Sequence, residues 1–346
     1  CVLARELALR VKGVNYPYLI ACVYFSGSSW VTGLSSSIPL LLSTKNNYLM
    51  EAGILSEIIP TAYTLGSNLN MAMMILFLVV APFLILILIP KTKNILELND
   101  MLESIDDKKE QSIKDEAISL NLSFNALSDR LNNGILIQGI LVIMGLTYII
   151  FHFYTKGFEL NFNIMIFIFL ILGMLLHKTP MRYVIAMKRS SNNISGILYQ
   201  YPFYAGIMGI MLYTGLGEKL AQIMASVATI DSYAFFAYIT GGIVNFAIPS
   251  AGGEFAVVGP SIINAIKDIG AGLPPQEISA MLSRASLSVA YGESLTNLLQ
   301  PFFLLLVFPI MGAGIKIQAR DVMGYLVIPF LIFFVIQSIL VTYMPL

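Results

Sequence analysis

The hydrophobic positions of this chain are gathered into long apolar runs that are separated by short polar segments. Five of the runs come close to the roughly 20 apolar residues that an α-helix needs to cross the hydrocarbon core of a bilayer. We therefore expect each of them to form one transmembrane helix: 71–89, 134–154, 162–176, 192–213 and 322–343.

Two further runs are too long for one span and are polar in the middle. Val14–Thr44 carries no charge and contains SGSSWVTGLSSS followed by Pro39, whereas Ala285–Ile315 carries one charge, Glu293, inside YGESLTNLLQP. Small polar residues and a proline at this depth favour a helix that is broken near the bilayer centre. The sequence therefore predicts two discontinuous transmembrane helices.

A third interruption lies in VNFAIPSAGGEFAVVGP, from Val244 to Pro260. Pro249 cannot continue helical hydrogen bonding, and small residues after it allow a sharp turn: Ser250, Gly252 and Gly253. The apolar arms on either side are each too short for a span: Tyr233–Phe246 and Phe255–Ile266. We expect a re-entrant hairpin, with one long proline-kinked helix as the alternative. Glu254, an acid beside the turn, favours a wet and polar site.

The basic residues predict how these elements are oriented. They gather in the segments 1–13, 177–189 and 316–320, which the positive-inside rule places on the cytoplasmic side. All three segments fall on that side only if the hairpin does not cross the membrane. The hydrophilic segment 91–133 mixes both signs of charge, and we expect it to be a cytoplasmic linker between two halves.

The two halves predict an inverted repeat. The broken run 14–44 passes from inside to outside and the run 285–315 passes the other way, as inverted-topology repeats do. Residues 1–90 would be the C-terminal part of the first repeat, and residues 134–346 would be the second. A hairpin matching that of the second repeat would precede Cys1, so we expect a missing N-terminal portion. The expected fold class is an all-α polytopic membrane protein with inverted repeats, a re-entrant hairpin and discontinuous transmembrane helices.

Composition agrees with a membrane protein and narrows the chemistry. The 346 residues are 57% hydrophobic and 12% charged, compared with about 25% charged in soluble domains. The net charge of zero gives no indication of a nucleic-acid partner, and two cysteines and two histidines are too few for a disulfide framework or a metal cluster. The acids are isolated, and the sequence has no nucleotide-binding, zinc-protease or hydrolase motif. We expect no cofactor, no metal and no enzymatic activity.

Helices that break at mid-membrane depth present free N–H groups at one new end and free carbonyls at the other. The N–H groups carry roughly half a positive charge and suit a carboxylate, and the carbonyls suit a cation. Neutral polar and aromatic side chains at the same depth would orient a small carboxylate without a buried fixed charge. The residues expected to bind substrate are Ser28, Trp30, Ser35, Ser36, Asn245, Pro249, Ser250, Gly252, Gly253, Thr296, Asn297 and Gln300.

Glu254 and Glu293 are the charged residues of the hairpin and of the second broken helix. An acid at the centre of a membrane helix costs on the order of 3 kcal/mol, which makes each a functional candidate. Removal from water favours a protonated carboxyl, so we expect either residue to carry the coupling ion, a proton in preference to Na⁺. In the structural alternatives, Glu293 bonds to Asn297 one turn later, Glu254 faces solvent at a cavity mouth, and 26–37 packs through its small residues.

Seven segments carry a resemblance to a known family. In chain order they are RELALRV (5–11), YPYLIACVY (16–24), HKTPM (177–181), SGILYQYPFYAGI (195–207), VNFAIPSAGGEFAVVGP (244–260), AYGESLTNLLQPF (290–302) and ARDVMGY (319–325). On these segments the sequence resembles the short-chain fatty acid transporter family, which includes bacterial carriers of acetoacetate and butyrate. The resemblance covers nearly the whole chain in collinear order, and the family is longer at its N-terminus.

The resemblance implies uptake of short-chain monocarboxylates, and kinship with the ion transporter superfamily, whose carriers have two hairpins and two broken helices. The chain departs from the family at positions of the expected site. The family tends to have Gly at Ala251, His or Gln at Glu254, Trp at Leu295, and Gly at Val31 and Thr32. These departures bear on which carboxylate is carried.

The expected function is therefore secondary active transport of short-chain fatty acids by alternating access, in a multi-pass protein of the bacterial cytoplasmic (inner) membrane. The alternative is a carrier of the same architecture for another organic anion, such as a dicarboxylate or a peptide-like compound. The expected partners are the carboxylate substrate, a coupling ion and the lipid bilayer. A homodimer is among the alternatives for assembly, and no nucleic acid is expected.

Overall fold

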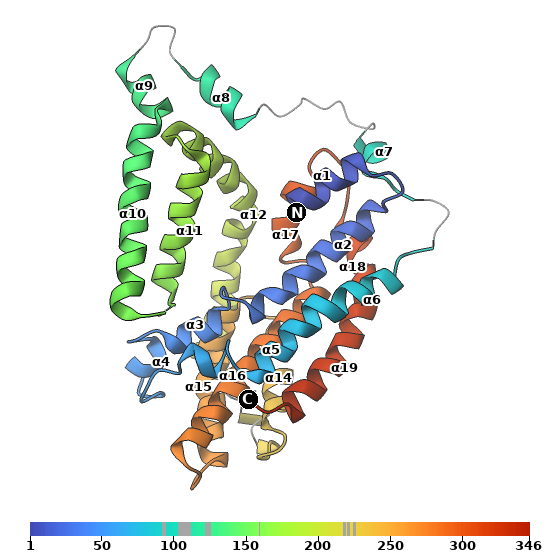
Figure 1. Cartoon of the computed structure of the whole chain (residues 1–346). Helices are drawn as coiled ribbons and strands as arrows, with labels where there is room; N and C mark the ends of the chain where they lie inside the picture. The colour runs from blue at the N-terminus through green and yellow to red at the C-terminus, as the bar shows by residue number, and fades with distance from the viewer. Residues whose placement is uncertain are drawn as a thin grey trace. The chain divides into compact units, whose positions relative to one another are not determined.

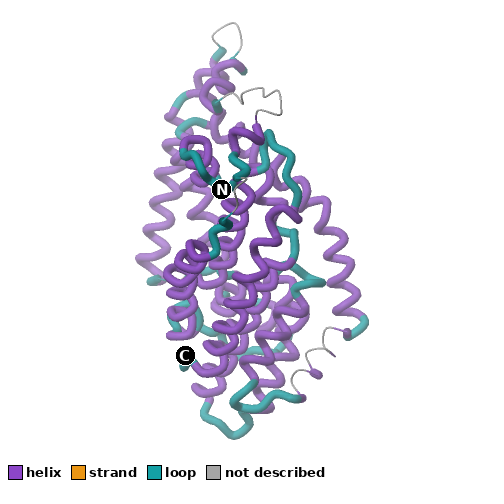
Figure 2. Tube along the Cα trace, turned by 90° about the vertical axis from the view of Figure 1, so that its right-hand side faces the viewer, coloured by secondary structure: helices purple, strands orange, loops and turns teal. Residues whose placement is uncertain are grey.

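A computed structural model describes the chain except for residues 92–94, 103–111, 122–125, 159, 217–218, 220–221 and 224–225, and except for the side chains at 162, 192–197, 200–201, 204, 208, 211–212 and 305. In the described part the regular elements are helices, and no strand is present (Figure 2). The helices form two compact units, residues 1–105 with 197–346 and residues 106–196.

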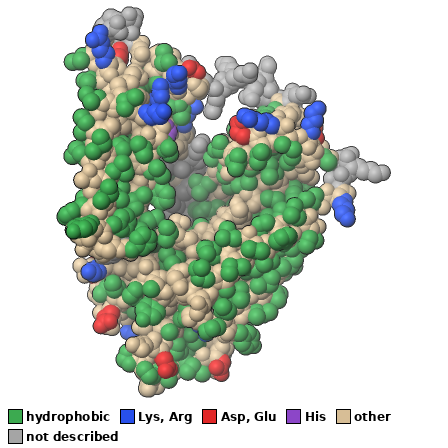
Figure 3. All heavy atoms as spheres, viewed as in Figure 1, with side chains coloured by type: hydrophobic (Ala, Val, Ile, Leu, Met, Phe, Trp, Pro, Cys, Tyr) green, Lys and Arg blue, Asp and Glu red, His purple; other side chains and the backbone are tan. Residues whose placement is uncertain are grey.

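Three helical stretches of the described chain are long and apolar enough to cross a membrane. They are Asn68–Ile87, Ile135–Lys156 and Ala319–Tyr343. Two shorter apolar helices accompany them, Asn163–His177 and Tyr233–Val244. Apolar side chains cover much of the visible surface (Figure 3). This all-helical, apolar architecture fits the expected polytopic membrane protein.

Several of these stretches are divided into consecutive helices. The first consists of α5 (Asn68–Ile75), the π-helical turn η3 (Leu76–Val80) and α6 (Ala81–Ile87). The last consists of α18 (Ala319–Met323), η5 (Gly324–Leu326) and α19 (Val327–Tyr343). Short helices connect the longer ones in the same unit: α4 (Tyr48–Glu51), η2 (Thr61–Tyr63) and α7 (Leu98–Leu102).

The unit of residues 106–196 contains α8 (Ile113–Ser119), α9 (Leu127–Asn133), α10 (Ile135–Lys156), α11 (Phe162–His177) and the beginning of α12 (Pro180–Tyr213). Helices α10 and α11 lie side by side (Figure 1). The Gln138 amide joins them by donating to the carbonyl of Met174. Glu116 of α8 forms an ion pair with Arg189 of α12.

The start of α12 corrects one expectation. Most of the basic segment 177–189, expected as a loop, is helical, because α12 begins at Pro180 and not at residue 192. Proline suits the first turn of a helix, where its missing N–H leaves no bond unmade. The expected linker 91–133 contains the short helices α7, α8 and α9, and its residues 92–94, 103–111 and 122–125 lie outside the described part.

The first over-long run is interrupted in the middle. After α1 (Val2–Arg10) come α2 (Tyr16–Gly27), the 3₁₀ turn η1 (Ser28–Thr32), a non-helical segment at 33–36, and α3 (Ser37–Ser43). Hydroxyl groups explain the change of helix type, since Ser26, Ser29 and Thr32 each donate to the carbonyl three residues earlier. Such bonds compete with regular α-helical ones. We call residues 28–36 the first break.

The second half contains the other interruptions. Helix α14 (Tyr233–Val244) is followed by α15 (Ala251–Ile269), α16 (Pro275–Thr296), η4 (Asn297–Leu299) and α17 (Leu304–Met311). We call residues 245–250 the hairpin turn and residues 297–303 the second break. The turn lies earlier than expected, because Ser250 has extended backbone angles and α15 begins at the next residue. Gly252 and Gly253 are therefore helical and do not form the turn.

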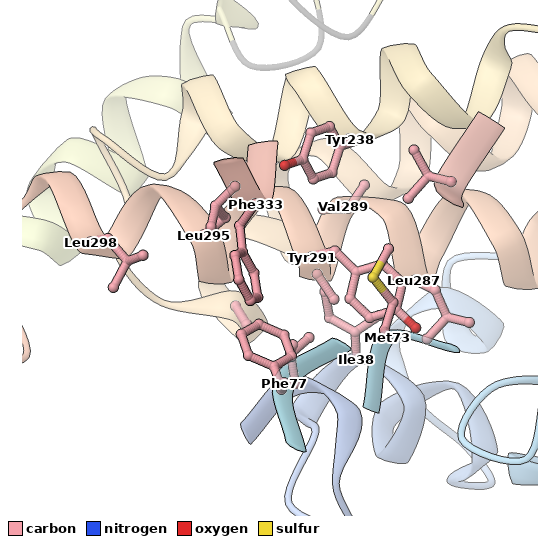
Figure 4. Close-up of a cluster of buried hydrophobic side chains, with 14 of the residues drawn as sticks. Ile38, Met73, Phe77, Tyr238, Leu287, Val289, Tyr291, Leu295, Leu298 and Phe333 are labelled. Carbon is pink, nitrogen blue, oxygen red and sulfur yellow. The ribbon is translucent and has the colours of Figure 1, made fainter. Parts of the chain in front are cut away.

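Helices α14 and α16 pack unusually closely. A Cβ atom at Gly292 would lie 2.0 Å from the carbonyl oxygen of Tyr238, and one at Gly241 would lie 2.4 Å from that of Val289. Tyr238 and Val289 lie in a buried cluster with Phe333 of α19 (Figure 4). Because Tyr238 faces Gly292 and Asn245 reaches Asn297, the two helices run parallel, and the turn after α14 lies level with the second break.

Candidate functional site

The first break, the hairpin turn and the second break meet at a cavity of about 700 Å³. All three belong to the same compact unit. The cavity is lined by Cys1, Val23, Tyr24, Ser26, Gly27, Ser28, Trp30, Ser37, Pro249, Ser250, Ala251, Gly252, Glu293, Ser294, Asn297, Phe302, Phe303, Leu306 and Val307. Irregular backbone in a membrane protein is stable when it lines a cavity or is buried in protein, and residues of all three interruptions line this cavity.

Asn245 joins the hairpin turn to the second break. Its Nδ2 donates to the carbonyl of Glu293 at 3.0 Å, to Oγ1 of Thr296 at 2.8 Å and to Oδ1 of Asn297 at 3.0 Å. Gln300 closes the network, because its Nε2 donates to the carbonyl of Asn245 at 3.3 Å and to Oδ1 of Asn297 at 2.9 Å. The hairpin turn and the second break are therefore held together.

The first break is joined to the second by other side chains. Ser294 Oγ donates to the carbonyl of Ser28 at 2.7 Å, and the Tyr24 hydroxyl donates to the carbonyls of Asn297 at 2.9 Å and Gln300 at 2.8 Å. These bonds occupy backbone carbonyls that lose their helical partners at a break.

Asn70 holds the backbone of the first break and is itself held by Tyr291. Asn70 Nδ2 donates to the carbonyl of Thr32 at 3.0 Å, and the buried hydroxyl of Tyr291 donates to Asn70 Oδ1 at 2.9 Å. Neither residue was among the expected site residues, nor were Tyr24 and Ser294. Only Ser294 and Tyr291 had a signal, their place inside the polar centre of the second over-long run.

Glu293 lies in the cavity wall and is fully buried, with an exposed fraction of 0%. Its Oε1 accepts a hydrogen bond from Nδ2 of Asn297 at 3.0 Å, as the structural alternative predicted. Its Oε2 has no hydrogen-bond partner among the residues that the structure describes. Glu293 therefore makes a structural hydrogen bond to Asn297 and also lines the cavity.

Glu254 is fully buried. Its exposed fraction is 0%, so the structural alternative of a solvent-facing acid at a cavity mouth is wrong. Because α15 begins at Ala251, Glu254 falls on the same helix face as the buried residues Ala251, Phe255 and Val258. Neither carboxylate oxygen has a hydrogen-bond partner within the described part of the chain. Glu254 lies one turn after the hairpin turn, and Glu293 lies one turn before the second break, on helices α15 and α16 that pack against each other.

The structure distributes the expected substrate-binding residues over three places. The cavity wall contains Ser28, Trp30, Pro249, Ser250, Gly252 and Asn297. The buried network beside it contains Asn245, Thr296 and Gln300. The remaining ones are not among the lining residues: Ser35, Ser36 and Gly253. Ser37 takes the place expected for Ser35 and Ser36, because α3 begins there.

The lining combines neutral polar groups with an apolar wall. Trp30, Phe302, Phe303 and Val307 supply apolar surface, while the polar groups are hydroxyls, an amide, the Glu293 carboxyl and the backbone of the hairpin turn. Lys, Arg and His are not among the described lining residues. No group of three or more His, Cys, Asp or Glu side chains in the described chain is arranged to hold a metal ion. Such a cavity suits a small molecule with one polar end and a short apolar tail.

The family model for short chain fatty acid transporters matches residues 1–344. The chain belongs to the short-chain fatty acid transporter family. A protein of Escherichia coli (strain K12) named "Putative short-chain fatty acid transporter" is 34% identical over 324 residues, which are 93% of this chain and 68% of that protein. A protein of the same name from Haemophilus influenzae is 32% identical over 326 residues, with the same two shares covered. No solved structure matches the chain.

Family membership agrees with the helical architecture. It makes the chain a membrane transport protein of the short-chain fatty acid transporter family, which is not a family of enzymes. The segments that suggested the resemblance include the hairpin turn and the second break, so the family match and the cavity involve the same residues.

Proposed function

We propose that the protein is a secondary active transporter that carries short-chain fatty acids, such as butyrate or acetoacetate, across the bacterial cytoplasmic membrane by alternating access. The observation that carries the proposal is the cavity at which three interruptions of helical backbone meet. Family membership supports the substrate class. A neutral polar lining with an apolar wall supports a ligand of one charge and a short tail.

The carboxylate would bind at the beginning of α15. This helix has 19 residues, and its N-cap residue Ser250 makes no side-chain capping bond. The first N–H groups of a helix have no partner within it and carry partial positive charge. Ser250, Ala251 and Gly252 line the cavity, and a Cβ atom at Gly252 would meet nothing within 4 Å. The N–H groups at this end of α15 therefore suit an anion in the cavity.

The alternative is a carrier of the same architecture for another organic anion. A dicarboxylate would bring a second negative charge, which a fixed cation would normally neutralise. The described lining residues include no lysine or arginine and do include the acid Glu293. These charges favour a monocarboxylate over a dicarboxylate.

The proposed architecture is an inverted repeat with a re-entrant hairpin formed by α14 and α15. With 12 residues, α14 is about 18 Å long, which is short for a hydrocarbon core of roughly 30 Å. Two polar breaks of similar form support the repeat. Basic residues support one cytoplasmic end: Arg5 donates to the carbonyls of Met311 and Ala313, shortly before Lys316.

Coupling to protons completes the proposal. Glu293 lies in the cavity wall and bonds to Asn297, which would contact the substrate. A proton taken up at this acid would offset the charge of the carboxylate.

Counterflow in proteoliposomes tests the proposal. Vesicles containing the purified protein and unlabelled butyrate should accumulate external labelled butyrate transiently and saturably. Succinate inside the vesicles should not support this exchange. If loaded vesicles take up no more label than protein-free ones, the proposed function is wrong. Exchange with succinate but not with butyrate would instead support the dicarboxylate alternative.

A further inference from the structure

We infer that Glu254 and Glu293 form one carboxyl pair that holds a single shared proton, and that Asn297 links this pair to the bound substrate. The inference rests on the proposed carrier function. It adds that the coupling site consists of two acids from neighbouring helices acting as one group.

The geometry of the pair comes first. Glu254 is in the first turn of α15 and Glu293 is in the last turn of α16, and both have an exposed fraction of 0%. Each acid lies one helical turn from the break at its end of the helix, at Ser250 and at Asn297, and α15 packs against α16, so the two residues lie at the same level. Of their four oxygens, three have no hydrogen-bond partner in the described part of the chain: Glu254 Oε1 and Oε2, and Glu293 Oε2. A buried acceptor without a donor costs free energy, so a proton bound by these two acids would stabilise the site.

The surrounding charges do not supply a counter-ion. Arg284 of α16 donates to the carbonyls of Val341 and Thr342, and it lies about 13 Å along the helix from Glu293. Lys267 of α15 donates to the carbonyl of Ile54, about 20 Å along the helix from Glu254. No lysine or arginine that the structure describes is therefore placed to pair with either acid.

The other ionisable groups of the neighbouring elements are tyrosines, cysteines and two acids at the far ends of their helices. The Tyr24, Tyr238 and Tyr291 hydroxyls donate to the Asn297 and Gln300 carbonyls, to Gln337 and to Asn70. Tyr233 and Tyr343 begin α14 and end α19, Cys22, Tyr16 and Tyr18 belong to α2, and Cys1 lines the cavity. Glu277 and Asp268 lie at the far ends of α16 and α15.

Two carboxylates at close range in a buried site repel each other, so one of them keeps a proton. A Glu254 hydroxyl that donates to Glu293 Oε2 would satisfy two of the three free oxygens at once. The pair then carries one negative charge, and loss of the shared proton would leave two.

Asn297 connects the pair to the cavity. Its Nδ2 donates to Glu293 Oε1, and the residue also lines the cavity wall. A substrate carboxylate in the cavity adds a negative charge beside Glu293 and competes for the same amide donor. Protonation of the pair removes the repulsion and weakens the hold of Glu293 on Asn297. Proton and anion therefore promote each other's binding, and the effect is reciprocal.

Two measurements on the purified protein test the inference. The first is butyrate affinity of the wild type between pH 5 and 9. One shared, titrating proton predicts that affinity falls with rising pH, by about tenfold per unit beyond the transition. A flat profile, or a slope approaching a hundredfold per unit as for two independent protons, would overturn the inference. This measurement needs no variant.

The second measurement is proton uptake on butyrate binding in weakly buffered solution. The wild type should take up about one proton per butyrate above the transition, and Glu254→Gln should take up almost none, because Glu293 then has no second acid with which to share a proton. Glu277→Gln, an exposed acid on the same helix as Glu293, is the matched control and should behave as the wild type does. Unchanged proton uptake in Glu254→Gln would overturn the inference and leave the carrier function standing, whereas absence of wild-type counterflow would count against the carrier itself.

Discussion

The side-chain amide of Asn245, one residue after α14 ends, donates to the side-chain oxygen of Asn297, one residue after α16 ends, at 3.0 Å. Two parallel helices thus stop at the same level, and their ends are tied by the residues that follow them. This bond fixes the hairpin turn against the second break, and the cavity lies beside it. The proposed binding site depends on α14 and α16 ending at the same level.

Replacement of Asn245 by alanine should weaken the site and the fold together. The change removes the two N–H groups that serve three buried acceptors and leaves acceptors unpaired, with an expected cost of about 1–3 kcal/mol in the free energy of unfolding. Thermal unfolding in detergent measures this loss, and titration with butyrate should show affinity reduced at least tenfold. Asn68→Ala removes one exposed bond to the carbonyl of Leu346, and as the control it should change stability by less than about 0.5 kcal/mol. Equal effects of the two changes would contradict the role of Asn245.

Gly292→Ala should separate α14 from α16. The added Cβ would lie 2.0 Å from the backbone oxygen of Tyr238, so the helices must move apart, at a cost of about 1–3 kcal/mol or more. Thermal unfolding should therefore occur at a clearly lower temperature. Gly324→Ala meets nothing within 4 Å and is the matched control. A Gly292→Ala protein as stable as the wild type would show that the two helices do not pack this closely.

Gly252→Ala should affect binding without affecting the fold. The added methyl group meets no protein atom within 4 Å, and Gly252 lines the cavity at the beginning of α15. We expect unchanged thermal unfolding and a reduction of butyrate affinity of about tenfold, because the methyl group occupies the space next to the N–H groups. Unchanged affinity would place the carboxylate elsewhere.

The apolar wall should set the preference for chain length. Each buried methylene contributes about 0.8 kcal/mol, or roughly fourfold in affinity. Butyrate should therefore bind more tightly than acetate, and Phe302→Ala should reduce that ratio while changing acetate affinity little. Competition against labelled butyrate gives both affinities. Phe246, exposed on the hairpin turn and absent from the cavity lining, provides the control in Phe246→Ala, for which the ratio should not change.

Much of this architecture follows from local sequence. The hydroxyl-rich segment after Tyr24 and the polar centre YGESLTN both predicted interruptions that the structure contains, because hydroxyl groups, glycine and proline act on the backbone of their own neighbourhood. The beginning of α15 was misplaced, since Gly252 and Gly253 are compatible with either a turn or a helix. That small displacement decides the burial of Glu254, which lies on the buried face of α15 and not at a solvent-facing cavity mouth.

Contacts between distant segments could not be predicted. Tyr24 donates to the carbonyl of Asn297, and Tyr291 donates to the side chain of Asn70. Both bonds support the breaks, and each joins residues more than 200 positions apart. A hydrophobic pattern predicts whether a residue is buried and on which face of its helix it lies, but not which distant residue it contacts. The placement of Glu254 and Glu293 at the same level likewise depends on the packing of α15 against α16, which only the fold determines.

The location of bound butyrate tests the central claim most directly. A density map of the purified protein with butyrate should show the carboxylate within hydrogen-bond distance of the N–H groups at Ala251 and Gly252, with the tail toward Trp30 and Phe302. Butyrate bound outside the cavity formed by the two breaks and the hairpin turn, or a cavity that stays empty at saturating butyrate, would contradict the account.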